Sequence, residues 1–302
     1  MAVSTPQRSA EAAVKALGSS RRRVARERRF AGLLVVSTAV AVAVLAVLLI
    51  DILLDGAGRL NWQFLTSYPS RRAEQTGILA GLTGTASLMV LVAAMAFPLG
   101  VGAAIYLEEF APDNRFTRLM EVNISNLAGV PSIVYGLLGA AVFVYILGMG
   151  RSLISGAATL TLLILPVIIV AGRESLRAVP RALRDAGLAL GATRWQVTRR
   201  EILPLAMPGI FTGTILALSR AIGETAPILL VGALASTRFS NEPWNLLERF
   251  SALPITIYGF VTRPQAEFKE EASAAAIIVL MVVLLIMNSI AIVLRNRAQR
   301  SL

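Results

Sequence analysis

The sequence of 302 residues contains no cysteine and no histidine. These absences exclude disulfide bonds and remove the usual protein ligands of structural zinc, haem and iron–sulfur clusters. They also exclude catalytic centres of the Ser/His/Asp and Cys/His types, which need an imidazole or a thiol. We therefore expect no metal, no cofactor and no enzymatic activity on this chain.

Lysine is almost as rare, since only Lys15 and Lys269 occur, followed by Ala16 and Glu270. A P-loop needs Gly-Lys-Ser/Thr, because its backbone cradles phosphates, its lysine reaches them and its hydroxyl holds magnesium. That motif is absent from the sequence. If ATP hydrolysis drives this protein, ATP and magnesium are expected on a partner chain.

Charged residues are scarce and apolar runs are long. Only 16% of the residues are charged and 56% are hydrophobic, whereas about a quarter of the residues of soluble domains are charged. Several runs exceed the ~20 residues that a helix needs to cross a bilayer. The sequence predicts an all-α polytopic membrane protein with six transmembrane helices, at about 31–54, 80–107, 124–148, 152–172, 208–235 and 272–294.

Lysine and arginine are unevenly distributed between the two sides of these spans. Most of them fall in the N-terminal tail 1–30, in the loops 108–123 and 173–207, and in the C-terminal tail. The positive-inside rule then predicts that both termini are cytoplasmic, which fits an even number of spans. Because the basic residues are scattered among loops, the formal net charge of +11 indicates a lipid bilayer rather than a nucleic acid as the partner.

The loop 173–207 alternates apolar and basic residues, a pattern typical of amphipathic helices. We expect two short helices that meet near Gly191, where glycine permits a tight turn. Pro204 and Pro208 then punctuate the return to the membrane. Such a loop either rests on lipid head groups with its arginines extended toward water, or docks a cytoplasmic protein.

The run LALSRAIGETAPILLVG contains Arg220 and Glu224, four positions apart. An arginine at the centre of a bilayer costs about 2.5–3.5 kcal/mol on insertion scales. The two charges either neutralise each other on one helix face or form part of a substrate path. Pro227 favours the path, because it removes the helical partner of the Gly223 carbonyl and creates irregular backbone between the charges. The planar fork of Arg220 suits an oxyanion.

A second interrupted run surrounds Asn126, Gly129, Pro131 and Ser132. Its polar side chains either line the same path, or its small residues serve a kinked helix that packs closely against a neighbour.

Two further features have ordinary structural interpretations. Gly100 and Gly102 begin a G-x-G pattern inside a span, which we interpret as helix packing rather than a nucleotide site. Glu108 and Glu109 close the second span and are expected at a solvated helix end, although they could instead meet the basic loop 173–200 or an ATPase.

The loop 173–207 resembles the cytoplasmic-loop motif EAA-x3-G-x9-I-x-LP of ABC importer permeases. It departs from the motif with Asp185 for Glu, Gly187 for Ala and Glu201 for Ile. The resemblance implies that the loop forms a coupling helix that sits in a groove of an ATPase subunit. The coupling-loop residues that it indicates are Asp185, Ala186, Gly187, Gly191, Ala192, Leu203 and Pro204.

The stretch SRAIGETAP at 219–227 resembles the fifth-span signature of phosphate-specific ABC permeases, the Pst family. AIYLEEFAP at 104–112, NLAGVPSIVYGLLG at 126–139 and RESLRAVPRALRDAGLALGATRWQ at 173–196 agree with it, and the ending GETAP is similar to that of the A-type (PstA) permeases. The resemblance implies a type I importer permease fold for 31–302 and a role for Arg220 and Glu224 in phosphate passage.

The same resemblance implies a set of partners. They would be a C-type permease, a dimer of ATPase subunits and an extracytoplasmic phosphate-binding protein, assembled at the cytoplasmic (inner) membrane of a prokaryote. Two alternatives remain at this point: a permease for another oxyanion such as sulfate or molybdate, and a self-sufficient secondary anion transporter.

Overall fold

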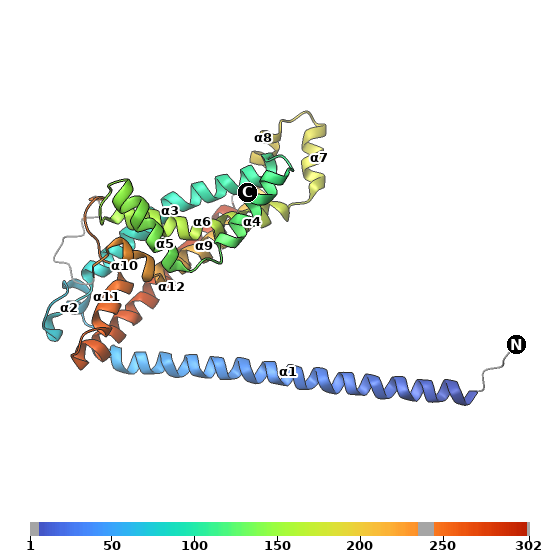
Figure 1. Ribbon diagram of the computed structural model, residues 1–302, viewed down its shortest axis with the longest axis horizontal. Helices are drawn as coiled ribbons and strands as arrows, with labels where there is room; N and C mark the ends of the chain where they lie inside the picture. Colours follow the sequence, from blue (N-terminus) through green and yellow to red (C-terminus); the bar gives the residue numbers. More distant parts are fainter. Residues whose placement is uncertain (1–5, 235–244, 301–302) are drawn as a thin grey trace. The chain divides into compact units, whose positions relative to one another are not determined.

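The computed structural model describes residues 6–234 and 245–300, which are helical with connecting loops and contain no strand (Figure 1). The chain divides into two compact units, one ending at Leu54 and the other beginning at Asp55. The all-α prediction is therefore confirmed for the described residues.

The first unit is formed by α1 up to Leu54. This single helix of 52 residues runs from Pro6 to Ala57, so its last three residues belong to the second unit. Its segment Arg26–Ala57 is long and apolar enough to cross a membrane, and the predicted span 31–54 lies inside it. The helix continues through residue 30, where the sequence predicts a change from a cytoplasmic tail to a membrane domain. That functional division stays a prediction.

The second unit contains the remaining elements in chain order. The first part comprises α2 (Trp62–Thr66), the short 3-10 helix η1 (Ala73–Gln75), α3 (Leu79–Ile105), the π-helical turn η2 (Tyr106–Phe110), α4 (Arg115–Leu127), α5 (Ser132–Gly139), the π-helix η3 (Ala140–Ile146) and α6 (Leu153–Arg177). The second part comprises α7 (Arg181–Ala189), α8 (Arg194–Val197), the π-helical turn η4 (Thr198–Ile202), α9 (Leu203–Gly223), α10 (Ala226–Val231), α11 (Leu253–Val261), the π-helical turn η5 (Phe268–Ala272) and α12 (Ser273–Arg300).

Within the described residues, five helical segments are long and apolar enough to span a membrane, or six if a bent pair is counted as one span. The bent pair joins Arg115–Leu127 to Ser132–Ile146 at an angle of 105°. It overlaps the predicted span 124–148 up to Ile146, and the Gly and Pro residues of that span had indicated the interruption. The five continuous segments are Arg26–Ala57, Leu79–Phe110, Leu153–Arg177, Arg194–Gly223 and Phe268–Arg297.

Helix α6 lies at the centre of the second unit, packed between α3, α5 and α9. Its side chains Leu160, Ile164 and Ile168 are almost completely buried. Close approach at this helix depends on small residues: a Cβ on Gly100 of α3 would lie 3.0 Å from the Ile168 Cβ. Since lipid does not drive helices together through the hydrophobic effect, such close packing is a main source of association.

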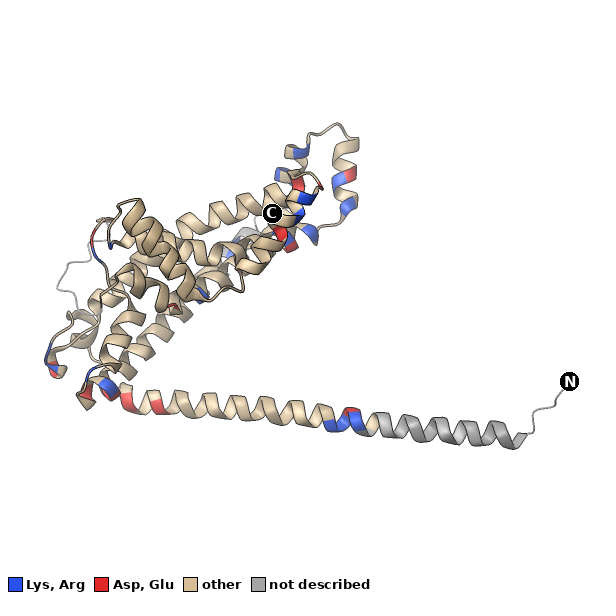
Figure 2. Cartoon of the chain, in the orientation of Figure 1, with Lys and Arg blue, Asp and Glu red and all other residues tan. Residues whose placement is uncertain are grey.

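The charged residues of the second unit are distributed as expected for a unit that spans a membrane. Figure 2 shows that the charged residues of the second unit gather toward its two ends, many of them around α7 and α8. The helices between these ends carry few charges. The arrangement matches the low cost of charge in water and its high cost in hydrocarbon.

We predict that Gly100→Leu destabilises the protein by about 1–3 kcal/mol, because the added side chain overpacks the contact between α3 and α6. Gly102→Leu is the matched control, since Gly102 lies on the same helix and a Cβ there would meet nothing within 4 Å. Thermal unfolding of the purified chain in detergent measures the difference. Equal unfolding temperatures for the two variants would contradict the packing argument.

Candidate functional site

The backbone of the fifth predicted span breaks beside its charged residues. Helix α9 ends at Gly223, Glu224 is extended with φ −74° and ψ 120°, and α10 begins at Ala226 with Pro227 in its first turn. Pro227 has no N–H to offer the carbonyl of Gly223, so the helix cannot continue through these residues. The predicted interruption between the charges is confirmed.

Arg220 and Glu224 form an ion pair across this break. The Arg220 Nε lies 3.3 Å from the Glu224 Oε1, and the two side chains are 45% and 16% exposed. The charges therefore pair, while nearly half of the arginine side chain remains accessible, and a role of the pair in a substrate path stays a prediction. Its place in the last turn of α9 also puts a cation at the negative end of a helix dipole.

The location of Arg220 along the span differs from the prediction. The sequence places it near the middle of a helix over 208–235, whereas the continuous segment is Arg194–Gly223 and Arg220 lies close to its end. From Leu203, the first residue of α9, the rise to Arg220 is about 26 Å at about 1.5 Å per residue. The charge therefore lies well away from the end of α9 that joins α7 and α8.

A polar contact fixes α9 to α12 next to Arg220. Ser219 Oγ donates to the Asn288 Oδ1 of α12 at 2.6 Å and also lies 2.7 Å from the Ile215 carbonyl oxygen. Hydrogen bonds between polar side chains hold neighbouring helices together in an apolar environment. The orientation of the last turn of α9, and with it the direction of Arg220, is thereby restricted.

The two interrupted segments of the unit meet at a glycine. A Cβ on Gly136 of α5 would lie 2.7 Å from the Pro227 Cα of α10, so glycine is required for this approach. The neighbouring Tyr135 hydroxyl donates to the Leu127 carbonyl at 2.7 Å, which links α5 to the end of α4 across their bend. Tyr135 is close enough to Arg220 to interact with it electrostatically.

Asn126 and Ser132 stand on either side of the bend between α4 and α5. Asn126 is exposed near the end of α4, and Ser132 is half-buried at the start of α5. Among the described residues, neither side chain is hydrogen-bonded to the Arg220–Glu224 pair. A Cβ on Gly129 would meet only the Asn126 carbonyl, at 3.5 Å, so Gly129 serves no close helix contact. A role for these residues in a substrate path stays a prediction.

The loop 173–207 contains the turn that its glycine predicts. Helix α7 carries Asp185, Ala186 and Gly187, and it ends before Gly191, whose φ is +81°. The Gly191 N–H donates to the Leu188 carbonyl at 3.0 Å, and the Ala192 N–H donates to the Gly187 carbonyl at 3.2 Å. This pair of bonds is a Schellman motif, in which the left-handed residue is usually glycine.

The second helix of the loop is not a separate short element as predicted. It begins with a capping box, in which Thr193 Oγ1 accepts from the Gln196 N–H at 3.3 Å and Gln196 Oε1 accepts from the Thr193 N–H at 2.8 Å. It then continues through η4 into α9 without a break. Leu203 and Pro204 are the first residues of α9, but the helix is continuous here. The π-helical turn η4 before them therefore accommodates the missing N–H of Pro204.

Helices α7 and α8 pack closely and leave an open groove beside them. A Cβ on Gly187 would lie 2.7 Å from the Val197 Cγ2, which explains why glycine suits this position of the motif. The most prominent apolar side chain is Leu190, which is 89% exposed. The groove has a volume of about 420 Å³ and is lined by Leu183, Ala186, Gly187, Leu190, Ala192, Gln196, Val197, Arg200 and Glu201.

The chain is similar in sequence to known permeases. The chain is 35% identical over 224 residues to a probable ABC transporter permease protein YqgI of Bacillus subtilis, covering 74% of this chain and 76% of the relative. It is 31% identical over 247 residues to the phosphate transport system permease protein PstA of Haemophilus influenzae, covering 80% and 84%. It is 40% identical over 190 residues to PstA 1 of Mycobacterium tuberculosis H37Rv, covering 63% and 60%.

Solved structures share the fold at low identity. A chain of the MetNI methionine ABC transporter in an inward-facing conformation matches with a TM-score of 0.54 at 18% identity, covering 74% of this chain and 96% of that one. A chain of a bacterial ABC transporter involved in the import of the acidic polysaccharide alginate matches with a TM-score of 0.52 at 14% identity, covering 76% of this chain and 80% of that one. These likenesses confirm the predicted importer permease fold.

The match to a protein family extends over most of the second unit, from residue 96 to residue 300. That range contains the broken span with Arg220 and Glu224, the bend between α4 and α5, and the whole loop from Arg173 to Pro204. The chain belongs to the family of binding-protein-dependent transport system inner membrane components.

Proposed function

We propose that the chain is the A-type permease subunit of an ATP-driven importer that moves inorganic phosphate across the cytoplasmic membrane. The observation that carries the proposal is the accessible side chain of Arg220, which is 45% exposed at a break in an apolar span. The relatives named as phosphate transport permeases in Haemophilus influenzae and Mycobacterium tuberculosis support phosphate as the substrate.

The chemistry of the pair suits a passing oxyanion. A guanidinium donates through a planar fork that matches two oxygens of a phosphate, and it keeps its charge at any physiological pH. Glu224 engages the Arg220 Nε and leaves the remainder of the side chain partly accessible. The carboxylate thereby holds the arginine in place and repels a second anion. The backbone break supplies the irregular structure that membrane proteins use where a path crosses the bilayer.

A second permease would complete the path. Lipid around an exposed arginine would be costly, so the accessible side of Arg220 should face protein or water in the assembled transporter. A C-type permease subunit would supply that covering surface, and an extracytoplasmic binding protein would deliver phosphate. Both termini and the α7–α8 loop would then lie in the cytoplasm, in agreement with the distribution of basic residues.

ATP hydrolysis is assigned to a dimer of partner subunits. The exposed Leu190 and the adjoining groove between α7 and α8 offer an apolar surface of the kind that marks a docking site. A sulfate or molybdate permease would also use an arginine, and here the similarity to phosphate permeases favours phosphate. A secondary transporter is disfavoured by membership of a binding-protein-dependent family.

We predict that Arg220→Ala abolishes phosphate uptake while the complex still assembles, because the anion loses its counter-charge. Arg220→Lys should retain a small fraction of the uptake, since an ammonium keeps the charge without the fork. Arg118→Ala is the control, because its surface pair with Asp113 is 74% and 93% exposed. Labelled phosphate uptake into cells measures the effect, and normal uptake by Arg220→Ala would reduce the residue to a structural role.

Gly191→Val should reduce the stimulation of ATP hydrolysis by the loaded binding protein. A β-branched residue at a φ of +81° is strained, so the end of α7 would be reshaped. Gly191→Asn is the matched control, because asparagine tolerates the left-handed conformation. Hydrogen exchange should show faster exchange of the Gly187–Ala192 turn in the valine variant alone. Full stimulation in that variant would oppose the docking assignment.

The predicted partners are tested by isolating the tagged chain from its native membranes in mild detergent. Mass spectrometry should identify an ATPase subunit and a second multi-span permease in the purified complex. Recovery of the folded chain alone, in repeated preparations, would favour a self-sufficient transporter instead.

A further inference from the structure

Glu108 and Glu109 occupy η2, at the end of α3, and their carboxylates are nearly buried. The side chains are 15% and 9% exposed. The expectation of a solvated helix end is therefore wrong, and the alternative contact with the basic loop is observed. Successive residues of a helix project in different directions, so the two carboxylates reach different partners. Each of them meets at least one arginine from α6 or α7.

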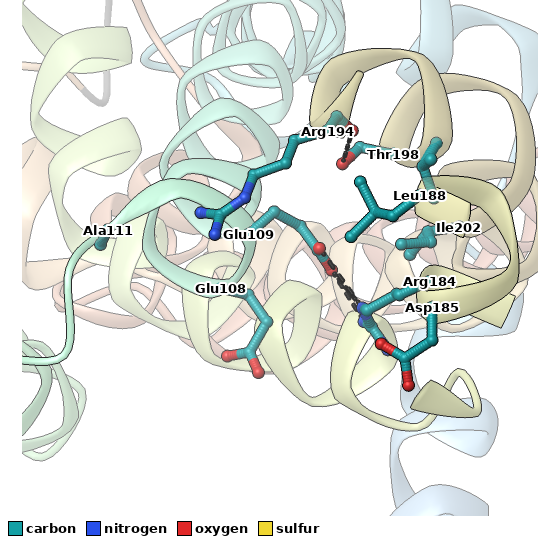
Figure 3. Close-up of a pocket in the computed structure, with 10 residues that line it drawn as sticks. Glu108, Glu109, Ala111, Arg184, Asp185, Leu188, Arg194, Thr198 and Ile202 are labelled. Carbon is teal, nitrogen blue, oxygen red and sulfur yellow. Dashed lines mark hydrogen bonds and ion pairs between the residues drawn. The ribbon is translucent and has the colours of Figure 1, made fainter. Parts of the chain in front are cut away.

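Arg184 of α7 is the partner of Glu109 (Figure 3). Its Nη2 and Nε lie 2.7 Å and 3.2 Å from the Glu109 Oε1, and its side chain is 19% exposed. The same guanidinium donates to the Val179 carbonyl at 2.8 Å and to the Leu176 carbonyl at 2.7 Å. One side chain therefore joins α7, the end of α6 and the end of α3.

The contacts of Arg184 with these two carbonyls satisfy hydrogen-bond acceptors at the end of α6. The last carbonyls of a helix have no N–H partner within it, and a basic side chain can satisfy them. Leu176 lies in the last turn of α6, and Val179 lies between α6 and α7. The Arg184 guanidinium thus fills positions that a simple ion pair would leave empty. Its fork geometry, rather than its charge alone, matches three acceptors.

A second cluster extends the contact to α4. Arg173 of α6 donates to Glu108 at 3.3 Å and to Glu121 of α4 at 2.7 Å, and Arg177 donates to Glu108 at 3.0 Å. The Arg173 side chain is 12% exposed. The ends of α3, α4 and α6 are therefore held together by directional bonds, and α7 is attached to them through Arg184.

We propose that Arg184 is a positioning residue that makes α7 move as one body with the adjoining ends of α3 and α6. The proposal rests on the proposed function, in which an ATPase displaces α7. Displacement would pass through Glu109 and Glu108 to α4, and through the bend to α5. Helix α5 contacts α10 where Gly136 meets Pro227, three residues after Glu224. Movement of the loop would thereby reach the backbone break next to Arg220.

The chemistry of the cluster favours positioning over simple stabilisation. A buried ion pair is often no more stabilising than an apolar contact of the same size, but its geometry is more specific. Removal of one partner leaves the other charge buried and unpaired, so the contact acts as a unit. Such a contact can hold α7 in one orientation while permitting α7 and its neighbours to shift together.

The first test compares Arg184→Gln with Arg181→Gln in the complete complex reconstituted into vesicles. Arg181 is exposed on the same helix, and among the described residues it has no ion pair. We expect Arg184→Gln to lower the phosphate transported per ATP hydrolysed by about tenfold, within the range of known coupling effects. Arg181→Gln should change it less than about twofold, and Arg184→Lys should be intermediate because it loses the fork.

The second test does not depend on phosphate. Since the chain has no cysteine, Ala189→Cys on α7 and Phe116→Cys on α4 allow two spin labels at exposed positions. The distance between the labels, measured by electron paramagnetic resonance on the full chain in detergent, should be narrowly distributed. Arg184→Gln and Glu109→Gln should broaden the distribution, whereas Arg181→Gln should leave it unchanged.

The label distances and the ratio of phosphate to ATP together distinguish failure of this proposal from failure of the proposed function. An unchanged distance distribution in folded Arg184→Gln overturns the proposal, whatever the transport result. A broadened distribution with an unchanged ratio of phosphate to ATP also overturns it, because the contact would then be structural only. If the unsubstituted complex transports no phosphate, the proposed function fails. The label distances would then still decide whether Arg184 holds α7 in place.

Discussion

The high cost of an unpaired charge in an apolar environment governs the arrangement of this protein. Arg220 is accommodated where α9 ends, with Glu224 as its partner and the negative end of the helix dipole beside it. The carboxylates of Glu108 and Glu109 are accommodated by arginines from two helices. In both places a charge specifies the geometry around it, because removing one partner would leave the other exposed to an environment that cannot solvate it.

Glycine residues allow the close helix contacts that connect these two charged clusters. Gly136 allows α10 to contact α5 through Pro227, and Gly100 allows α3 to contact Ile168 of α6. A side chain at either glycine would separate helices that form the frame around Arg220. The interrupted segments α4–α5 and α9–α10 consequently lie against each other. The family to which the chain belongs transports substrates across membranes, and a frame of broken helices offers backbone that can rearrange without losing the packed centre formed by α6.

Much of the site could be predicted because single residues dictate local structure. Pro227 cannot donate to Gly223, so the break follows from the sequence, and Gly191 permits the left-handed turn that ends α7. Other expectations were wrong where contacts between distant segments decide. Glu109 is buried by Arg184, which lies 75 positions later. The second helix of the loop joins α9 because η4 accommodates Pro204, and periodicity does not reveal a π-helical turn.

The amino-acid sequence was enough to predict the helical class, the apolar spans, the absence of a nucleotide motif and the turns at glycine and proline. These features depend on composition and on the conformational limits of individual residues. The folded structure was needed to show which arginine meets which carboxylate, how exposed Arg220 remains, and that α5 and α10 touch at Gly136. Such facts depend on the packing of helices far apart in the chain. The energy of a charge or of a close contact is set by its neighbours in space, and local sequence patterns do not specify those neighbours.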